Sequence, residues 1–249
     1  MSSFDRAIGL ARSLAVYYGI PGRQRRLRAL YSQFVKPGDL VFDVGAHLGN
    51  RTRAFVALGC RVVAVEPQPH VARMLRTLVG GRANVHVVER AVTRDGGHAA
   101  LAVSERTPTV SSLAGDWRAA RAQDPDFAGV SWDQTFEVAA TTLDALIREH
   151  GRPAFIKIDV EGAELEVLHG LTGAVPAVSF EFLPAALDAA QACCARLAAL
   201  GPYRFNWSLA ESSRLVSPEW TDGPALIRAL RDGAPARHGD IYARLAAGM

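Results

Sequence analysis

The chain has 249 residues, of which 49% are hydrophobic and 21% charged, and its formal net charge is only +3. This length suits one large α/β domain, and the composition excludes extensive disorder. No apolar run is long enough to cross a bilayer, because Arg12 interrupts the best candidate at 8–20, which also lacks the features of a signal peptide. The three cysteines have no metal-binding spacing and predict reduced core thiols, so we expect a cytoplasmic protein.

Amphipathic segments precede the first expected strand. Residues 4–34 predict one or two helices, with a break near Gly19, Pro21 and Gly22. The basic run RQRRLR at 23–28 predicts a solvated helix face, with weak contact to a membrane surface or to an anionic substrate as the alternatives. We therefore divide the chain into an N-terminal helical extension, 1–35, and a single domain, 36–249.

From residue 40 onward, expected strands and helices alternate. Short apolar runs predict strands, and the segments between them have helical spacing. Single helices between successive strands imply right-handed crossovers and a parallel sheet, so the fold class is α/β. The expected strands are 40–44, 61–67, 84–92, 98–104, 135–141, 154–160 and 177–183, and the expected helices are 50–58, 70–79, 142–151, 163–171 and 187–201.

Two regions depart from this alternation. The polar stretch between 104 and 134 is long for a compact domain, and such loops are usually functional or mobile. Later in the chain, 203–209 and 213–218 predict a terminal hairpin. Hydroxyl and indole side chains in the polar stretch suit a polyhydroxylated ligand, namely those of Thr109, Ser111, Ser112, Trp117 and Trp132.

The turn after the first strand, DVGAHLGN at 43–50, is rich in glycine. Gly45 and Gly49 allow a tight turn and a close approach of the backbone to a ligand, which the start of the next helix would also face. The spacing is GxxxG and not the GxGxxG of dinucleotide-binding turns. This difference favours a ligand without a pyrophosphate and disfavours a nicotinamide-dependent dehydrogenase.

An acidic residue ends the second expected strand. Glu66 lies 21 residues after Gly45. At the tip of this strand a carboxylate is placed to accept hydrogen bonds from both hydroxyls of a ribose. The order of strand, turn, helix, strand and acid therefore predicts a nucleoside-type ligand.

The segment FIKIDVEGAELEVL at 155–168 begins as a buried strand and then becomes charged. Strand alternation places Lys157 and Asp159 on one face, where Lys157 could pair with Asp159 or Glu181, or act as a base if burial lowered its pKa. A purely structural role is the alternative, in which the acids add negative charge at a helix N-terminus; we favour that role for Glu164. Asp159, Glu161 and Glu181 could also hold a divalent metal ion, although the sequence does not require one.

Several segments together resemble the FkbM family of S-adenosylmethionine-dependent methyltransferases. The resemblance covers residues 36–183 and returns at HGDIYA, 238–243, and KIDVEGAE is its most family-specific run. It implies a Rossmann-like, doubly wound, seven-stranded sheet of the class I methyltransferase fold, with six parallel strands and one antiparallel edge strand supplied by the hairpin at 203–216. The matching segments are VFDVGAHLGNRT, VVAVEPQP, VHVVERAV, TTLDAL, FIKIDVEGAELEVLHG and SFEF.

The same resemblance implies which residues bind the cofactor, S-adenosyl-L-methionine, and its product, S-adenosyl-L-homocysteine. Glu66 would hold the ribose, Pro67 and Gln68 would flank the adenosine, and Asp159 would also face the cofactor. Those around the methionine portion would be Asp43, Gly45, Ala46, His47, Gly49, Asn50 and Thr52, and those along the adenine would be Glu89, Arg90 and Ala91.

Methyl transfer requires alignment of the acceptor and, for a hydroxyl, removal of its proton. We expect Asp159, Lys157 and Glu181 to be the catalytic residues. The acceptor is expected to be a hydroxyl of a small molecule, either a saccharide or a polyketide-type metabolite, and no nucleic-acid partner is expected. N-methylation of an amine or peptide and a non-catalytic nucleotide-binding module are the alternatives.

Overall fold

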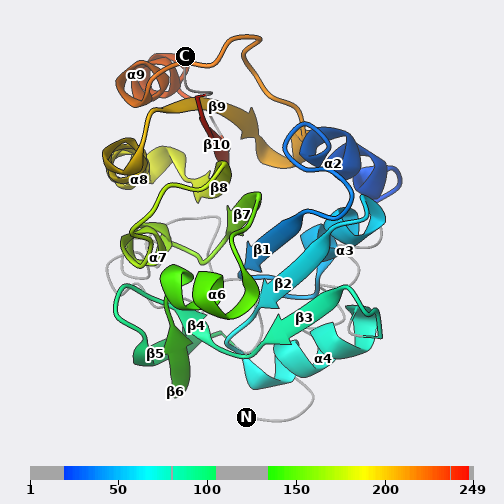
Figure 1. Ribbon diagram of the computed structural model, residues 1–249. Helices are drawn as coiled ribbons and strands as arrows, with labels where there is room; N and C mark the ends of the chain where they lie inside the picture. The colour runs from blue at the N-terminus through cyan, green and yellow to red at the C-terminus, as the bar shows by residue number, and fades with distance from the viewer. Residues whose placement is uncertain (1–19, 80, 105–133, 236, 247–249) are drawn as a thin grey trace.

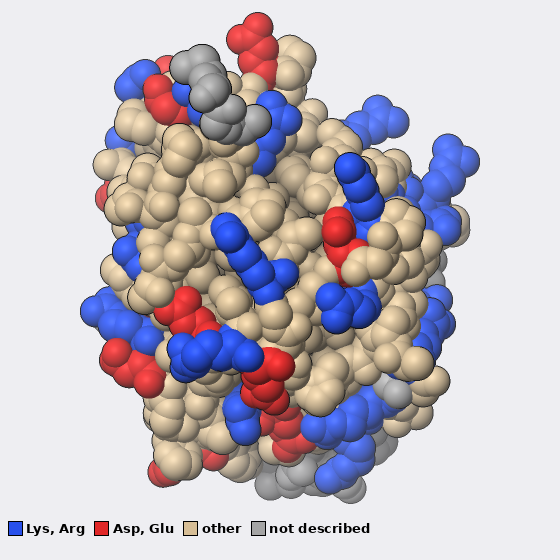
Figure 2. All heavy atoms as spheres, viewed as in Figure 1, with Lys and Arg blue, Asp and Glu red and all other residues tan. Residues whose placement is uncertain are grey.

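The computed structural model describes residues 20–79, 81–104, 134–235 and 237–246 (Figure 1). The expected helical residues 4–19 and the five side chains proposed for the polar stretch, 109–132, lie outside the described residues. No helix in the described part of the chain is both long and apolar enough to span a membrane. Basic and acidic side chains are interspersed on the face shown in Figure 2, in keeping with the small net charge.

A seven-stranded sheet forms the centre of the fold. Its strand order is β3-β2-β1-β7-β8-β10-β9, and β10 runs opposite to the other six strands. This confirms the predicted doubly wound class with six parallel strands and one antiparallel strand. The reversed strand, however, lies next to the edge strand β9 and is not itself at the edge. The strands are β1 (Leu40–Val44), β2 (Arg61–Val65), β3 (Val85–Val88), β7 (Phe155–Ile158), β8 (Ala177–Phe182), β9 (Tyr203–Leu209) and β10 (Gly239–Leu245).

Helices cover both faces of the sheet because successive strand residues point to opposite faces. Val41 packs with Phe55 of α3 and Leu75 of α4, whereas Phe42 packs on the other side with Leu143 of α6. The helices on the Val41 side are α2 (Arg23–Tyr31), α3 (Asn50–Ala57) and α4 (Pro69–Val79), and those on the Phe42 side are α6 (Leu143–His150), α7 (Glu164–His169), α8 (Leu187–Leu200) and α9 (Gly223–Gly233).

Helix α2 is part of the core on the Val41 side. Tyr31 is fully buried, and its ring centroid lies 4.3 Å from that of Phe55. Arg23 is also buried, so the expectation that 23–28 forms a wholly solvated face was wrong at this residue, while Arg25 and Arg28 are exposed. The helix has one apolar side and therefore turns only part of its basic run to solvent. The division of the chain at residue 35 stays a prediction.

The expected third strand, 84–92, is divided between two sheets. The chain bends at Glu89 and Arg90, which are exposed, and β4 (Ala91–Val92) then leaves the main sheet. There it joins a three-stranded sheet of order β4-β6-β5. Strands β5 (Gly97–Val103) and β6 (Gln134–Thr141) confirm the two strands predicted on either side of the polar stretch.

The predicted terminal hairpin at 203–216 was wrong. Strand β9 pairs with β10, and β10 also pairs with β8, so residues 239–245 supply the reversed strand. The segment after β9 contains a short 3-10 helix, Ala210–Ser212, and then folds back irregularly. Asn206 holds it there, because its Nδ2 donates to the carbonyl oxygen of Ser217 at 2.7 Å.

Candidate functional site

The turn between β1 and α3 lies against the end of β7. Gly45 and Gly49 have φ angles of 79° and 80°, in the left-handed region that favours glycine. A Cβ on Gly45 would lie 1.8 Å from the carbonyl oxygen of Asp159, and one on Gly49 would lie 2.7 Å from Leu75 Cδ1. The backbone amides of Gly45 and Ala46 donate to the Val65 carbonyl oxygen at 2.9 and 3.0 Å. Both glycines are therefore required to pack the turn.

We expect Gly45→Ala to lower the free energy of unfolding by at least about 1–2 kcal/mol. That figure covers the left-handed backbone alone, and overlap with Asp159 adds to it. Gly173→Ala is the matched control, because a Cβ at Gly173 would meet no atom within 4 Å. It should change stability by no more than about 0.5 kcal/mol. Urea denaturation measures both variants, and equal midpoints would contradict the expected clash.

Glu66 follows β2 and is held by backbone amides on both sides. The His47 amide donates to Glu66 Oε2 at 3.0 Å, and the Gln68 amide donates to Oε1 at 2.9 Å. The side chain is 3% exposed, and this burial raises the pKa of Glu66 to about 7 despite the two hydrogen bonds. A carboxylate oxygen can accept two hydrogen bonds, so the two backbone amides do not use the full capacity of the Glu66 carboxylate.

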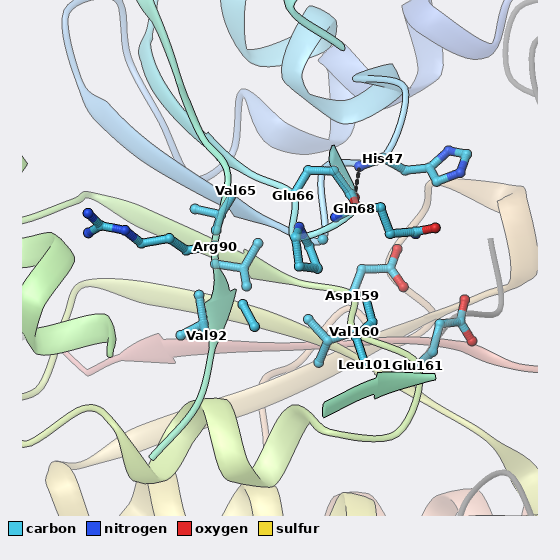
Figure 3. A pocket seen from close by; sticks show the side chains of 14 residues that line it. His47, Val65, Glu66, Gln68, Arg90, Val92, Leu101, Asp159, Val160 and Glu161 are labelled. Carbon is cyan, nitrogen blue, oxygen red and sulfur yellow. Dashed lines mark hydrogen bonds between the residues drawn. The ribbon is translucent and has the colours of Figure 1, made fainter. Parts of the chain in front are cut away.

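A pocket lies between the ends of β1, β2 and β7 and the three-stranded sheet (Figure 3). The pocket is open to solvent, and it contains about 550 Å³ of empty space when the space at its open mouth is included. The side chains of Gln68, Asp159 and Glu161 point towards one side, and apolar side chains gather on the other. The lining residues are Val44, Gly45, His47, Val65, Glu66, Pro67, Gln68, Arg90, Ala91, Val92, Leu101, Asp159, Val160 and Glu161.

The structure thus brings together many of the residues that sequence analysis selected. Gly45, His47, Glu66, Pro67, Gln68, Arg90, Ala91 and Asp159 all line the pocket. Burial lowers the pKa of His47 to about 4, so its imidazole is neutral near pH 7. The Arg90 guanidinium points away from the acidic side of the pocket, towards Glu149 at 4.0 Å.

Other predicted residues lie outside this lining and make contacts within the protein. Thr52 Oγ1 donates to Asp43 Oδ2 at 2.5 Å, which ties β1 to helix α3. Gln24 of α2 donates to Asn50 Oδ1 at 2.7 Å. Glu89 pairs with Arg76 at 2.7 Å on an exposed surface. Ala46 and Gly49 belong to the turn itself. Except for Glu89, these residues therefore support the turn and the helix next to the pocket.

Lys157 lies beneath the pocket in a buried ionic cluster. Its Nζ is 2.8 Å from Asp240 Oδ1 and 3.6 Å from Asp159 Oδ2, and it donates to the Ile158 carbonyl oxygen at 3.0 Å. Burial alone would lower the pKa of Lys157, but the Asp159 and Asp240 carboxylates outweigh it and raise that pKa above its usual value. The condition under which Lys157 would act as a base is therefore not met.

Sequence analysis missed two members of this cluster. Arg51, the second residue of α3, is 3.5 Å from Asp159 and 3.8 Å from Asp240. Asp240 comes from β10, and its only signal was the family resemblance of the HGDIYA segment. Leu101 of β5, which lines the apolar side of the pocket, was also missed because the three-stranded sheet was not foreseen.

Three carboxylates meet at the acidic side of the pocket. The closest ligand oxygens of Asp159, Glu161 and Glu181 all lie within 4.8 Å of one another, as expected for residues at the ends of β7 and β8. Burial and the negative charges of Glu161 and Asp159 raise the pKa of Glu181 well above its usual value. Oxygen ligands in this arrangement could take up a proton or a divalent cation.

Glu164 faces the turn that precedes its own helix. Its Oε1 accepts from the amides of Val160 and Gly162 at 3.3 and 3.2 Å, and the side chain is buried. These contacts hold the 159–162 turn, in which Glu161 has a positive φ of 54°. The favoured structural role of Glu164 agrees with this geometry.

The strand order, the reversed strand β10 and the pocket over β1, β2 and β7 define a class I, Rossmann-like methyltransferase fold. Residues 43–194 match the family profile described as "Methyltransferase FkbM domain". The chain belongs to the FkbM methyltransferase family, whose members use S-adenosylmethionine. No curated protein matches the chain in sequence.

Solved structures with a similar fold share little sequence with this chain. A precorrin-6y C5,15-methyltransferase from Geobacter metallireducens is 10% identical with a TM-score of 0.49, covering 90% of this chain and 87% of its own. A TehB-like SAM-dependent methyltransferase from Corynebacterium glutamicum is 8% identical with a TM-score of 0.47, covering 94% of each chain. A SAM-dependent O-methyltransferase from Thermotoga maritima is 14% identical with a TM-score of 0.43, covering 92% of this chain and 66% of its own.

Proposed function

We propose that this methyltransferase binds S-adenosylmethionine in the pocket beside Glu66 and methylates a hydroxyl of a small molecule, either a saccharide or a polyketide-type metabolite. One observation carries the proposal. The buried carboxylate of Glu66 follows β2, whereas Asp159 and Glu161 follow β7, and all three line one pocket; Glu181 of β8 lies beside the latter two. The Glu66 carboxylate suits a ribose, and the carboxylate group of Asp159, Glu161 and Glu181 suits an acceptor that must lose a proton.

Within the pocket, we assign Glu66 to the two ribose hydroxyls. Its two oxygens are fixed by the His47 and Gln68 amides, so the carboxylate is oriented before the ligand arrives. We assign the adenine to the apolar side, where Ala91 and Leu101 come from the three-stranded sheet. Bound S-adenosylmethionine supplies an electrophilic methyl group for in-line displacement.

On the acceptor side, we assign proton removal to the carboxylate group. A base is most effective when its pKa lies near the working pH, and the pKa of Glu181 is raised by burial and by its acidic neighbours. Asp159 lines the pocket and is held by Arg51, so we assign it to orienting the acceptor or accepting its proton. Lys157 is assigned a positioning role, because it contacts Asp159 from beneath the pocket.

The distribution of charge supports a small-molecule acceptor. Nucleic-acid binding depends on clustered basic side chains, and the face in Figure 2 has basic and acidic groups interspersed. A panel of saccharides, polyketide-type alcohols, amines and RNA tests the acceptor class with labelled S-adenosylmethionine. Methyl transfer only to amines would favour the N-methylation alternative, and transfer to RNA would contradict the proposal.

Running the panel with EDTA or Mg²⁺ tests whether the three carboxylates hold a divalent ion. A cytoplasmic location stays a prediction.

Cofactor affinity is expected to rise with pH through about 7. Burial raises the pKa of Glu66 to about 7, and the ribose hydroxyls need the ionised carboxylate as their acceptor. Below this pH the protonated form offers fewer acceptor sites, so S-adenosylmethionine binds more weakly. Glu66→Gln should remove the pH dependence, and Glu66→Ala should weaken binding by about 1–3 kcal/mol.

Calorimetry at pH 6, 7 and 8 measures these affinities without an acceptor. Glu89→Gln is the matched control, because Glu89 follows the neighbouring strand β3 but lies outside the pocket lining and pairs with Arg76. It should bind S-adenosylmethionine like the unaltered chain. If Glu66→Ala bound equally well, the ribose would lie elsewhere. If even the unaltered chain did not bind S-adenosylmethionine, the proposed function would fail as a whole.

A further inference from the structure

Two histidines and a glutamate meet on the surface of the domain, and none of the three lines the pocket. His86 lies on β3, and Glu149 and His150 are the last two residues of α6. Each of the three side chains offers one ligand atom, and these three atoms all lie within 4.8 Å of one another. The two imidazole centroids are 4.9 Å apart, and His150 Nε2 is 3.6 Å from Glu149 Oε1.

The register of the parallel sheet explains this meeting. Phe42 of β1 is the partner of Val63 on β2, and Val63 is the partner of His86 on β3. Partners in a sheet point to the same face, so these three side chains form a row on the face that α6 covers. The His150 ring packs edge-on against Phe42, with centroids 6.5 Å apart. This contact places His150 above the row and beside His86.

The local charges favour a cation. The carboxyl end of a helix carries partial negative charge, and both Glu149 and His150 lie in the last turn of α6. His150 Nε2 is buried and makes no hydrogen bond with the described residues. Glu149 Oε1 faces His150, while its Oε2 is 4.0 Å from Arg90. One carboxylate oxygen is thus available as a ligand, and the other has a positively charged partner.

We propose that His86, Glu149 and His150 bind a divalent transition-metal ion, with Zn²⁺ as the reference ion. Two imidazoles and one carboxylate form a known zinc ligand set that leaves a fourth position for water. Bonds of about 2.0–2.1 Å in a tetrahedral site place ligand atoms roughly 3.3 Å apart. His86 and Glu149 are exposed and reach this spacing by side-chain rotation, while His150 is held by Phe42.

This site differs in chemistry from the carboxylate group at the pocket. Asp159, Glu161 and Glu181 offer only oxygen atoms, which suit Mg²⁺ or Ca²⁺, whereas imidazole nitrogens suit Zn²⁺. A bound ion would connect the edge strand β3 to the end of α6. Arg90, which also lines the pocket, would be the outer partner of the ligating carboxylate.

The test is direct titration of the untagged, EDTA-treated and dialysed chain with Zn²⁺ by calorimetry, and with Co²⁺ by visible absorption. We expect one ion per chain, a tetrahedral Co²⁺ spectrum and a higher melting temperature with Zn²⁺. His86→Ala and Glu149→Gln should each weaken Zn²⁺ binding by at least about 10- to 100-fold, the loss typical when only an outer partner of a metal ligand is removed. Both residues are exposed, so neither change threatens folding.

Two matched variants serve as controls. His98→Ala removes an exposed histidine of β5 outside the cluster, and Glu161→Gln alters the carboxylate group at the pocket. Both should bind Zn²⁺ like the unaltered chain. Absence of Zn²⁺ binding, or undiminished binding by His86→Ala, would overturn the site, since the ion would then be held by other groups such as thiols. No cofactor or acceptor is needed, so the result is independent of the proposed function.

Discussion

Replacing Lys157 with methionine is expected to lower the free energy of unfolding by about 3–5 kcal/mol. The lysine is fully buried, and its Nζ is 2.8 Å from Asp240, which is itself only 8% exposed. Removing one partner of a buried ion pair leaves the other charge without compensation, and that cost exceeds the small gain from a more apolar side chain. Arg51, at 3.8 Å from Asp240, is too distant to replace the hydrogen bond.

The chain contains its own control for this change. Lys36 is the one other lysine in the sequence and is exposed, so Lys36→Met should alter stability by no more than about 0.5 kcal/mol. In a double-mutant cycle, Lys157→Met combined with Asp240→Asn should cost less than the sum of the two single changes. Chemical denaturation gives all four values. Additive losses would mean that the two side chains do not interact in the folded state.

Asp159→Asn is expected to reduce turnover by about 100- to 10,000-fold, the range for loss of a positioned proton-transfer group. Asp159 lines the pocket beside Glu161 and is 22% exposed, so it is accessible to an acceptor. Because asparagine keeps the size of the side chain, the turn against Gly45 should persist. Affinity for S-adenosylmethionine should therefore change far less than turnover.

The measurement pairs single-turnover methyl transfer with cofactor calorimetry, using the best acceptor from the panel. Glu181→Gln is the comparison, because its carboxylate belongs to the same group on the neighbouring strand. A large loss of turnover with Glu181→Gln and a small one with Asp159→Asn would identify Glu181, and not Asp159, as the base within the carboxylate group. Equal losses of turnover and cofactor affinity with Asp159→Asn would instead make Asp159 a cofactor or structural residue.

Local signals were sufficient to predict the first half of the main sheet and part of the pocket. Strand and helix periods identified β1, α3, β2 and α4, and the resemblance tied Glu66 and Asp159 to one crevice. These residues lie at the ends of parallel strands, and the ends of such strands meet at the same edge whatever the details of packing. Their positions at the ends of parallel strands, together with the resemblance, were therefore enough to place them at one edge of the sheet.

Long-range pairing accounts for what could not be predicted. Residues 213–218 look like a strand, but side-chain bonds from Asn206 to the backbone hold this segment in an irregular course. Asp240 could not be assigned to Lys157, because the two are 83 positions apart and meet only through the pairing of β10 with β8. The cluster of His86, Glu149 and His150 was missed for the same reason, since the end of helix α6 lies beside His86 of β3 only in the finished fold.

Strand β10 sits between β8 and β9, although it follows both in the chain. During synthesis or refolding, β9 therefore has no neighbouring strand in the main sheet until residues 239–245 arrive, and the edge of β8 stays open. Lys157 also lacks Asp240 until that moment. Completion of the sheet and neutralisation of its buried charge are thus one late event that depends on distant contacts, which are slow to form. A nascent chain that stalls before residue 239 would expose two unpaired strand edges, the kind of surface on which partly folded chains aggregate.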